Sequence, residues 1–267
     1  MADWPIFENS GYIEGITSSA ASPASANTKG TWYEAIAATE KDTIAVHINI
    51  GRHFASWVGE CLVDLGVGPS GSEEAVVSNM LYSASGATAG FNYLFPLRIP
   101  AGSRICTRGQ ANDSAARGIN VGTNLIYGSF LSNSGGAIVT TYGADTSDSG
   151  GVLVDPGGTA NTKGSWYEIT GSTTRKVNYF NLAIGNQGNT DRSRCYWLVD
   201  VGIGSAGNEV VIAKDLSLVG GEGENLNPSV FSIPVAIPAG VRIAVRAECT
   251  ITDATDRKFD AALYCMS

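Results

Sequence analysis

The sequence predicts an all-β protein of two tandem antiparallel β-sandwich domains, jelly-roll-like in type and derived from an internal duplication. Three observations predict this fold. Nine residues, ANTKGTWYE at 26–34, recur almost unchanged as ANTKGSWYE at 160–168. Glycine is abundant, at 33 of 267 residues, and glycine-rich clusters separate short runs rich in Val, Ile, Tyr and Trp. No long stretch has the hydrophobic period of a helix, so strands joined by turns remain.

The repeat continues along the chain in a fixed order. LVDLGVG at 62–68 returns as LVDVGIG at 198–204, and PLRIPAGSRI at 96–105 returns as PVAIPAGVRI at 234–243. Each unit is long enough to bury a core of its own. The predicted organisation is an N-terminal segment over 1–23, a first domain over 24–128, a connector over 129–151 and a second domain over 152–267.

Short strands fill each copy. In TIAVHINI at 43–50, apolar residues alternate with others, so one face of this strand is expected in the core. The second copy keeps apolar residues at the matching positions. The strands predicted in the first copy lie near residues 31–37, 43–50, 60–67, 75–82, 91–99, 103–110 and 119–127.

Charge and composition exclude several classes of protein. The formal net charge is −8, and the 17 Lys and Arg residues are scattered, so nucleic acid is not an expected partner. The start MADWPIFENS lacks the features of a secretory signal, and no apolar run approaches the ~20 residues of a membrane span. We therefore expect a soluble protein made in the cytoplasm, without membrane insertion. Its five cysteines are odd in number and lack C-x-x-C spacing, so we expect reduced, mostly buried thiols.

Familiar catalytic and metal-binding motifs are absent from the sequence. The two histidines, His47 and His53, stand opposite an asparagine and a glutamine in the second copy. No G-x-S-x-G, HExxH, P-loop or EF-hand pattern occurs. The loop DTSDSGG at 145–151 could hold calcium together with Asp155, but such acidic loops are usually solvated. We therefore expect no catalytic residues, no metal, no cofactor and no enzymatic activity.

Charged residues that both copies retain predict structural ion pairs. An aspartate inside LVDLG or LVDVG would lie in an apolar strand and would need a cationic partner, since removing one member of a buried pair costs about 3–5 kcal/mol. The candidate pairs join Asp64 to Arg104 or Arg108, and Asp200 to Arg242 or Arg246.

Two groups of aromatic and apolar residues are candidates for binding. The Trp-Tyr pair of each copy belongs either to the core or to an exposed face that stacks on sugars or a partner. The N-terminal DWPIF is either an anchoring arm or a segment folded onto the first domain. The candidate partner-contact or glycan-contact residues are therefore Trp4, Ile6, Phe7, Trp32, Tyr33, Trp166 and Tyr167.

With its tandem acidic β units and its LVDLGVG and PLRIPAGSRI blocks, the chain resembles virion structural proteins of tailed bacteriophages and phage-like particles. These are accessory proteins that decorate heads or form spikes, fibres and tail appendages. The resemblance spans about residues 24–127 and 157–264. It implies a homo-oligomer that contacts other virion proteins and is assembled in the bacterial cytoplasm, and it supplies no catalytic residues.

The function that the sequence favours is a non-enzymatic structural component of such a virion: a capsid decoration, head spike or fibre protein. Host surface polysaccharide is a further candidate partner. A tail or baseplate appendage, a receptor-binding protein and a stand-alone carbohydrate-binding module remain as alternatives. A glycosidase with two carboxylates ranks below them, because no pair of acids stands out in either copy.

Overall fold

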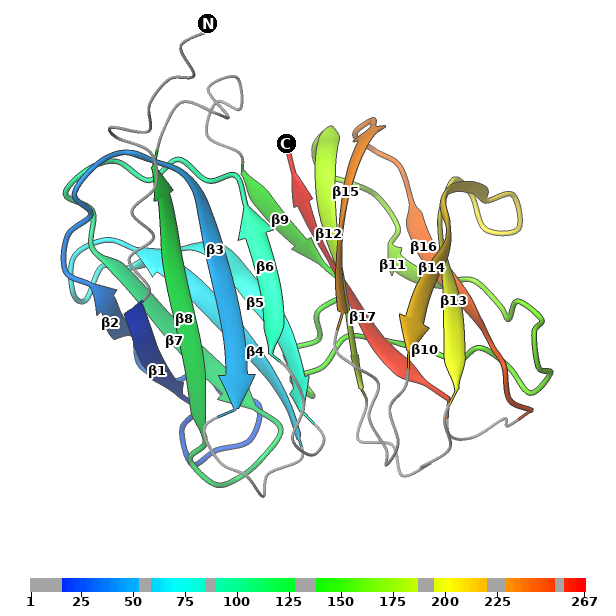
Figure 1. The fold of residues 1–267 in the computed structure, drawn as a ribbon, viewed down its shortest axis with the longest axis horizontal. Helices are drawn as coiled ribbons and strands as arrows, with labels where there is room; N and C mark the ends of the chain where they lie inside the picture. Colours follow the sequence, from blue (N-terminus) through cyan, green and yellow to red (C-terminus); the bar gives the residue numbers. More distant parts are fainter. Residues whose placement is uncertain are drawn as a thin grey trace, which may run out of the picture.

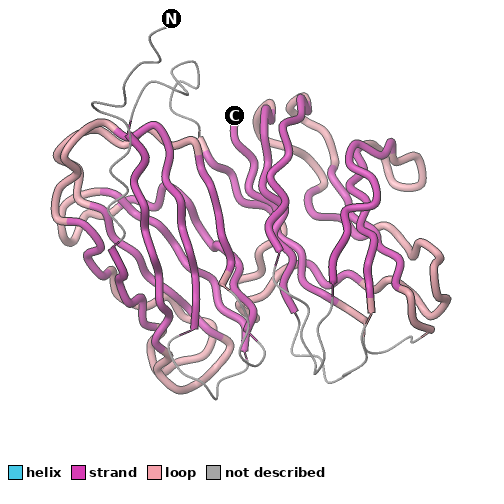
Figure 2. Tube along the Cα trace, in the orientation of Figure 1, coloured by secondary structure: helices cyan, strands magenta, loops and turns pink. Residues whose placement is uncertain are grey.

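The computed structural model describes residues 16–52, 59–84, 90–127, 138–186, 195–219, 229–252 and 257–267. Within these ranges the chain forms strands, turns and loops and no helix, so none is present there that could cross a membrane. Two β-sandwiches lie side by side (Figures 1 and 2). The predicted all-β class is confirmed. Trp4, Ile6, Phe7 and His53 lie outside the described residues.

The first sandwich, unit 1, is a jelly roll of eight strands. Two four-stranded antiparallel sheets face each other, in the orders β1-β8-β3-β6 and β2-β7-β4-β5. Strands adjacent in space are therefore distant in sequence, as the jelly roll requires. The strands are β1 (Ile16–Ala21), β2 (Tyr33–Ile36), β3 (Thr43–Arg52), β4 (Gly59–Val67), β5 (Glu74–Ala84), β6 (Phe91–Phe95), β7 (Ile105–Ala111) and β8 (Gly118–Tyr127).

The second sandwich, unit 2, repeats this topology strand for strand. Its sheets have the orders β10-β17-β12-β15 and β11-β16-β13-β14, and β9 adds to the first of them by pairing with β17. The strands are β9 (Val139–Tyr142), β10 (Val152–Val154), β11 (Tyr167–Thr170), β12 (Val177–Asn186), β13 (Tyr196–Ile203), β14 (Val210–Val219), β15 (Ser229–Ile237), β16 (Ile243–Cys249) and β17 (Phe259–Met266).

The predicted boundaries need two corrections. Residues Ile16–Ala21 form β1 and pair with β8, so unit 1 begins inside the segment 1–23 that the sequence placed outside the first domain. Residues 139–142 of the predicted connector form β9, and Ser149 and Gly150 are buried rather than exposed. Both short segments lack the apolar alternation by which the other strands are recognised.

Alternating apolar side chains build the core of each unit. In β3, Val46, Ile48 and Ile50 are fully buried between the two sheets of unit 1. Phe180 and Leu182 hold the matching positions of β12 in unit 2. Phe180 is larger than Val46, whereas Leu182 and Ile48 have the same number of atoms, so the core keeps apolar side chains at these positions rather than particular residues.

The two units share an apolar junction. The outer face of the sheet containing β12 and β17 packs against strands β5 and β6 of unit 1 (Figure 1). Ala183, Ala262, Tyr264 and Met266 of unit 2 are buried in the same hydrophobic cluster as the core of unit 1. The molecule is therefore one block with a continuous core across the junction.

Tyr264 fixes the junction with two hydrogen bonds to the backbone of β5. Its hydroxyl accepts a bond from the Leu81 N–H at 2.7 Å and donates one to the Asn79 carbonyl at 2.8 Å. Its ring meets Tyr93 edge-on, with 5.3 Å between centroids. These bonds satisfy polar groups that the buried edge of a sheet would otherwise leave unpaired.

Replacing Tyr264 by phenylalanine should destabilise the protein by about 1–3 kcal/mol, because two buried backbone groups lose their partner while the ring is kept. Urea unfolding measures this loss. Tyr142→Phe is the matched control, since the Tyr142 hydroxyl bonds to Thr174 at an exposed site. Equal effects of the two substitutions would contradict the role given to Tyr264.

Candidate functional site

The segment that opens each repeat acts as a strap that runs along one strand of a sheet. The first strap (residues 26–32) runs beside β7, with the Asn27 N–H bonded to the Ala111 carbonyl and the Gly30 N–H to that of Gly109. The second strap (residues 160–166) makes the same two bonds to β16. The near-identity of the two nine-residue segments therefore reflects one structural task performed twice.

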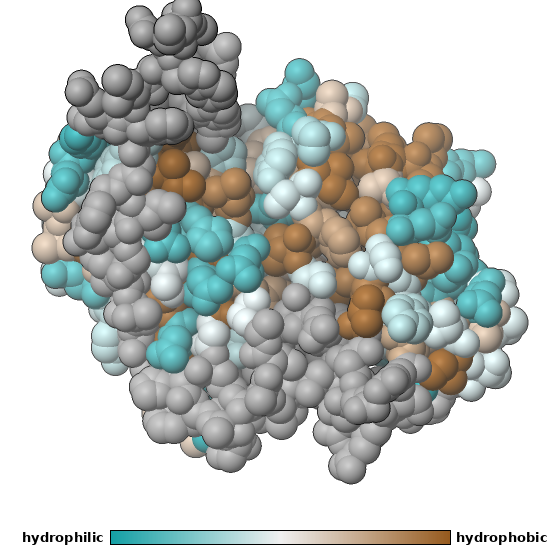
Figure 3. Space-filling model, viewed as in Figure 1, coloured by the Kyte–Doolittle hydropathy of each residue, from teal (hydrophilic) through white to brown (hydrophobic). Residues whose placement is uncertain are grey.

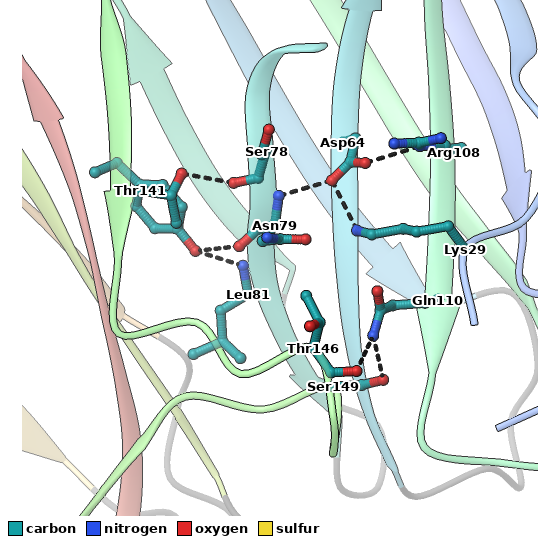
Figure 4. Close-up of polar contacts among 11 residues, drawn as sticks. Lys29, Asp64, Ser78, Asn79, Leu81, Arg108, Gln110, Thr141, Thr146 and Ser149 are labelled. Carbon is teal, nitrogen blue, oxygen red and sulfur yellow. Dashed lines mark hydrogen bonds and ion pairs between the residues drawn. The ribbon is translucent and has the colours of Figure 1, made fainter. Parts of the chain in front are cut away.

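The first strap delivers Lys29 to a buried aspartate, Asp64 (Figure 4). The side chain of Asp64 is 2 % exposed; its Oδ1 lies 2.7 Å from Lys29 Nζ and its Oδ2 lies 2.8 Å from Arg108 Nε. Oδ1 also accepts the N–H of Asn79 at 2.7 Å, where β5 bulges and Asn79 has a φ of 57°. The carboxylate thus neutralises two cations and satisfies the amide freed by the bulge.

Unit 2 repeats this centre around Asp200. Lys163 Nζ and Arg246 Nε each lie 3.0 Å from its carboxylate, and the N–H of Asp215, also at positive φ, donates to it at 3.0 Å. Burial acts to raise the pKa of Asp200, but these donors outweigh it and lower the pKa. The carboxylate therefore stays ionised, as its partners require.

Of the arginines left open by the sequence, Arg108 and Arg246 contact the aspartates. Arg104 instead bonds to Glu34 and Glu73, at 2.8 and 2.9 Å. Arg242 bonds to Glu168 and Glu209 in the same manner, at 2.6 and 2.8 Å. The lysine partners were missed, although both lie within the repeated ANTKG and could have been found there.

The tryptophans of the repeat are neither core residues nor free stacking platforms. Trp32 is half-buried, and the Arg108 guanidinium lies 4.3 Å from its ring centroid. Trp32 also covers Gly66 so closely that a Cβ there would lie 2.7 Å from the ring. Trp166 is held in the same way by Arg246 and Gly202. Of the neighbouring tyrosines, Tyr33 is exposed and Tyr167 half-buried.

Replacing Asp64 by alanine should cost about 3 kcal/mol of unfolding free energy, because two cations and one backbone N–H lose their acceptor. This lies at the lower end of the usual range, since Lys29 and Arg108 reach solvent. Asp42→Ala, which breaks an exposed pair with Arg98, should cost less than ~1 kcal/mol. Urea denaturation of both variants measures the difference, and similar losses would show that Asp64 is not a structural centre.

A second cluster, of carboxyl groups, lies where the units and the connector meet. Glu60 of β4, Asp260 of β17 and Asp148 of the connector each place an oxygen 3.2–3.3 Å from the position that a Cβ on Gly150 would occupy. Glu60 and Asp260 are close enough for each carboxyl group to influence the pKa of the other. Asp260 is fully buried, Glu60 is 7 % exposed and Asp148 faces solvent. We name this group the carboxyl cluster.

The carboxyl cluster holds a proton near neutral pH. Burial and then the neighbouring Asp148 raise the pKa of Glu60 to about 7. Burial and then the carboxyl group of Glu60 raise the pKa of Asp260 to about 8. Asn112 donates to Glu60 at 3.3 Å and orients it. A protonated carboxyl beside a carboxylate can donate or accept a proton, which is the chemistry of a general acid and base.

These acids escaped the sequence analysis because they have no counterparts in the repeat. The strand register makes Tyr196 of unit 2 the counterpart of Glu60. In the same way, Asn120 of unit 1 is the counterpart of Asp260. They are brought together only by the junction. Among the described residues, no three Asp, Glu, His or Cys side chains are arranged to hold a metal ion.

The acidic connector loop is docked on unit 1. Gln110 donates bonds of 3.0 Å to the Thr146 carbonyl and the Ser149 hydroxyl (Figure 4). Ser149 in turn donates to Asn27 of the first strap at 2.8 Å. The Asp145 carboxylate accepts the N–H and hydroxyl of Ser147. The loop is thus held by its own polar groups and by both units.

The outer face of the sheet containing β3 and β8 is a polar surface. His47 and Asn124 are bonded across the two strands at 3.0 Å, and Asn49 donates to Asn92 at 2.6 Å. Figure 3 shows hydrophilic atoms gathered over β8 and β3, whereas much of unit 2 is hydrophobic in the same view. We name His47, Asn49, Asn92 and Asn124 the amide face.

None of the five cysteines forms a disulfide, and all five are buried. A hydrogen bond from Cys195 lowers the pKa of Cys249 to about 7, whereas burial raises the pKa of Cys265 to about 12. Cys249 is only 2 % exposed, so its sulfur does not meet solvent.

Comparisons with known proteins give no family. No protein-family model and no curated protein matches the sequence. Among solved structures, N-glycanase F (PNGase F) has 9 % identity and a TM-score of 0.41, with 94 % of each chain covered. PNGF-II has 9 % identity and a TM-score of 0.37, and the chain, 88 % of it matched, spans 59 % of that protein.

Viral and carbohydrate-binding proteins occur among the further matches. The structure of infectious bursal disease virus Gx strain contains a chain with 11 % identity and a TM-score of 0.28, covering 96 % of this chain and 72 % of that one. The tandem CBM22 domains of Paenibacillus barcinonensis Xyn10C have 10 % identity and a TM-score of 0.26, covering 98 and 95 %. Likenesses this distant assign neither a family nor a function.

The comparisons contradict the expectation that the chain is not an enzyme, because several of the matched structures are of an asparagine amidase. One of them has 11 % identity and a TM-score of 0.38, and the match covers 94 % of this chain and 90 % of that one. A likeness this distant does not carry the activity of that protein over to this chain. The expectation depended on missing sequence motifs, and such motifs could not reveal the carboxyl cluster, whose members come from three separate segments.

The carboxyl cluster makes stability depend on pH. The unfolded chain releases these protons near the ordinary pKa values of 4.5 and 3.8, whereas the folded protein keeps them until about 7 and 8. Stability should therefore fall as the pH rises from about 4 to about 8, and then level off. Urea unfolding at constant ionic strength between these limits should show a decline that is smaller in Glu60→Gln.

The exposed Glu40→Gln is the control and should keep the decline of the unmodified protein. A decline of equal size in Glu60→Gln would exclude the carboxyl cluster as its source.

Proposed function

We propose that this protein is a structural component of a bacteriophage or phage-like virion, a capsid decoration, head spike or fibre protein located in the particle. The observation that carries the proposal is the continuous core across the junction, fixed by Tyr264, which makes the two jelly rolls one rigid block. An appendage must transmit position without bending between its domains, and a junction of this kind resists bending. The sequence resemblance to virion proteins supports the same conclusion.

Contact with host surface glycans is the second part of the proposal. The amide face offers imidazole and amide groups on a flat, open sheet, which suits the hydroxyl groups of a polysaccharide. Tyr33, the first residue of β2, is 42 % exposed and is the remaining aromatic candidate of the first copy. A tail or baseplate appendage would use the same surface as a receptor-binding site.

Immunogold electron microscopy of particles from a producing strain tests the proposal. An antibody against this chain should label heads or appendages at regular positions, and particles lacking the gene product should lose the label. Absence of the chain from purified particles would refute a virion role.

Hydrolysis is a second candidate function, favoured by the neighbouring carboxyl groups of Glu60 and Asp260, whose pKa values are raised to about 7 and about 8. Asp148 gives the carboxyl cluster its contact with solvent. Purified protein should then cleave a polysaccharide or a glycopeptide, with a rate that Glu60→Gln abolishes and Glu40→Gln preserves. No cleavage across pH 5–9, a range that spans both raised pKa values, would remove hydrolysis from consideration.

A further inference from the structure

Strand β5 of unit 1 is an edge strand that unit 2 covers. Thr141 of β9 donates to the Ser78 carbonyl at 2.7 Å (Figure 4). Tyr264 of β17 bonds to the next backbone groups of β5, the Asn79 carbonyl and the Leu81 N–H. Met80 and Leu81 of this strand are fully buried. The protein thus shows how this fold covers its β5 edge: with the outer face of another copy of the same fold.

Strand β14 is the counterpart of β5 in unit 2, and it is open. The register equates Leu81 with Ser217, because each lies opposite the leucine of the LVD motif. Ser217 is exposed, and Leu216 is half-buried where Met80 is fully buried. At its two ends, Val210 is 65 % exposed and Val219 is 47 % exposed. We name this strand the open edge.

The amide face is the counterpart of the face that covers β5. In the paired strands, Asn124 of β8 lies opposite His47 as Tyr264 of β17 lies opposite Asn181. Asn181, like Tyr264, reaches across the junction, and its Nδ2 donates to the Leu94 carbonyl at 2.9 Å. Within the described part of the chain, the internal junction thus uses one pair of surfaces, and a second pair with the same positions in the fold is left free.

The two pairs are matched in polarity. At the junction, Leu81 and Met80 belong to the same buried hydrophobic cluster as Ala183, Ala262 and Tyr264. In the free pair, the open edge presents Lys214, Asp215 and Ser217, and the amide face presents imidazole and amide groups. The open edge and the amide face are thus both polar, whereas the two surfaces that meet at the junction are both apolar. Each pair of surfaces is therefore complementary in polarity.

We propose that the open edge of one copy binds the amide face of a second copy, with the geometry of the internal junction. Such an interface is heterologous, because two different surfaces meet, and it generates a ring or an open chain of molecules. The proposal concerns contacts between copies alone and does not depend on a virion role. The polar surfaces predict a weaker contact than the internal one, favoured at high local concentration.

Site-directed cross-linking tests the proposal. Ser217→Cys and Asn124→Cys are prepared as separate proteins, mixed and treated with a short bis-maleimide reagent. The native thiols are all buried, so the new cysteines should react selectively. The equivalent groups at the junction, the Leu81 N–H and the Tyr264 hydroxyl, are 2.7 Å apart, and the reagent compensates for the shorter side chains.

The mixture should give a cross-linked species of about twice the 27.7 kDa of one chain. A control mixture of Ser217→Cys with Thr31→Cys, an exposed position on the first strap, should not. Adding Val210→Lys to the Ser217→Cys protein should lower the yield at least ~3-fold, a loss of binding of about 0.7 kcal/mol. A chain carrying both cysteines should give a ladder or one closed ring.

Three results would overturn the proposal. Self-cross-linking of Ser217→Cys alone, at the yield of the mixture, would show two-fold pairing of open edges. Equal yields with Thr31→Cys would show random collision. If light scattering at high concentration gave the mass of a single chain and no cross-linked product formed, the open edge and the amide face would not bind each other.

Discussion

The buried aspartate of each unit is the interaction on which the rest of the structure depends. One carboxylate meets a lysine from the strap, an arginine from the neighbouring strand and the amide of a bulge. Three separate segments are thereby fixed to one point of the sheet. Such a charge is costly to bury unless all its partners are present, so the segments are required together. Both copies therefore keep the whole set.

This dependence explains which residues the duplication retained and which it released. The straps, the glycines beneath the tryptophans and the bulge at positive φ recur in both units. The outer faces of the two matching sheets diverged instead, one to an apolar surface inside the junction and the other to the amide face. The fold therefore constrains the residues that build each sandwich, whereas the residues of an outer face depend on what that face contacts.

The sequence predicts the sandwich well, since seven of the strands of unit 1 follow from apolar alternation and turn residues. The aspartates followed from their apolar surroundings. The lysines did not follow: the repeat of ANTKG marked them, but a lysine in a polar segment looks solvated until its side chain is seen to reach the aspartate. The carboxyl cluster could not be predicted at all: Glu60 and Asp260 are 200 positions apart and meet only through the junction.

The place of Tyr264 in the chain has a consequence for synthesis. It belongs to β17, the strand closest to the C-terminus, yet its partners lie in β5 of unit 1. Domains generally fold from the N-terminus as they leave the ribosome. Unit 1 can form its own sheets early, but its β5 edge waits for nearly the whole polypeptide before it is sealed. A nascent or truncated chain that lacks β17 therefore exposes the unpaired β5 edge, which could pair with other chains, whereas the complete fold covers it.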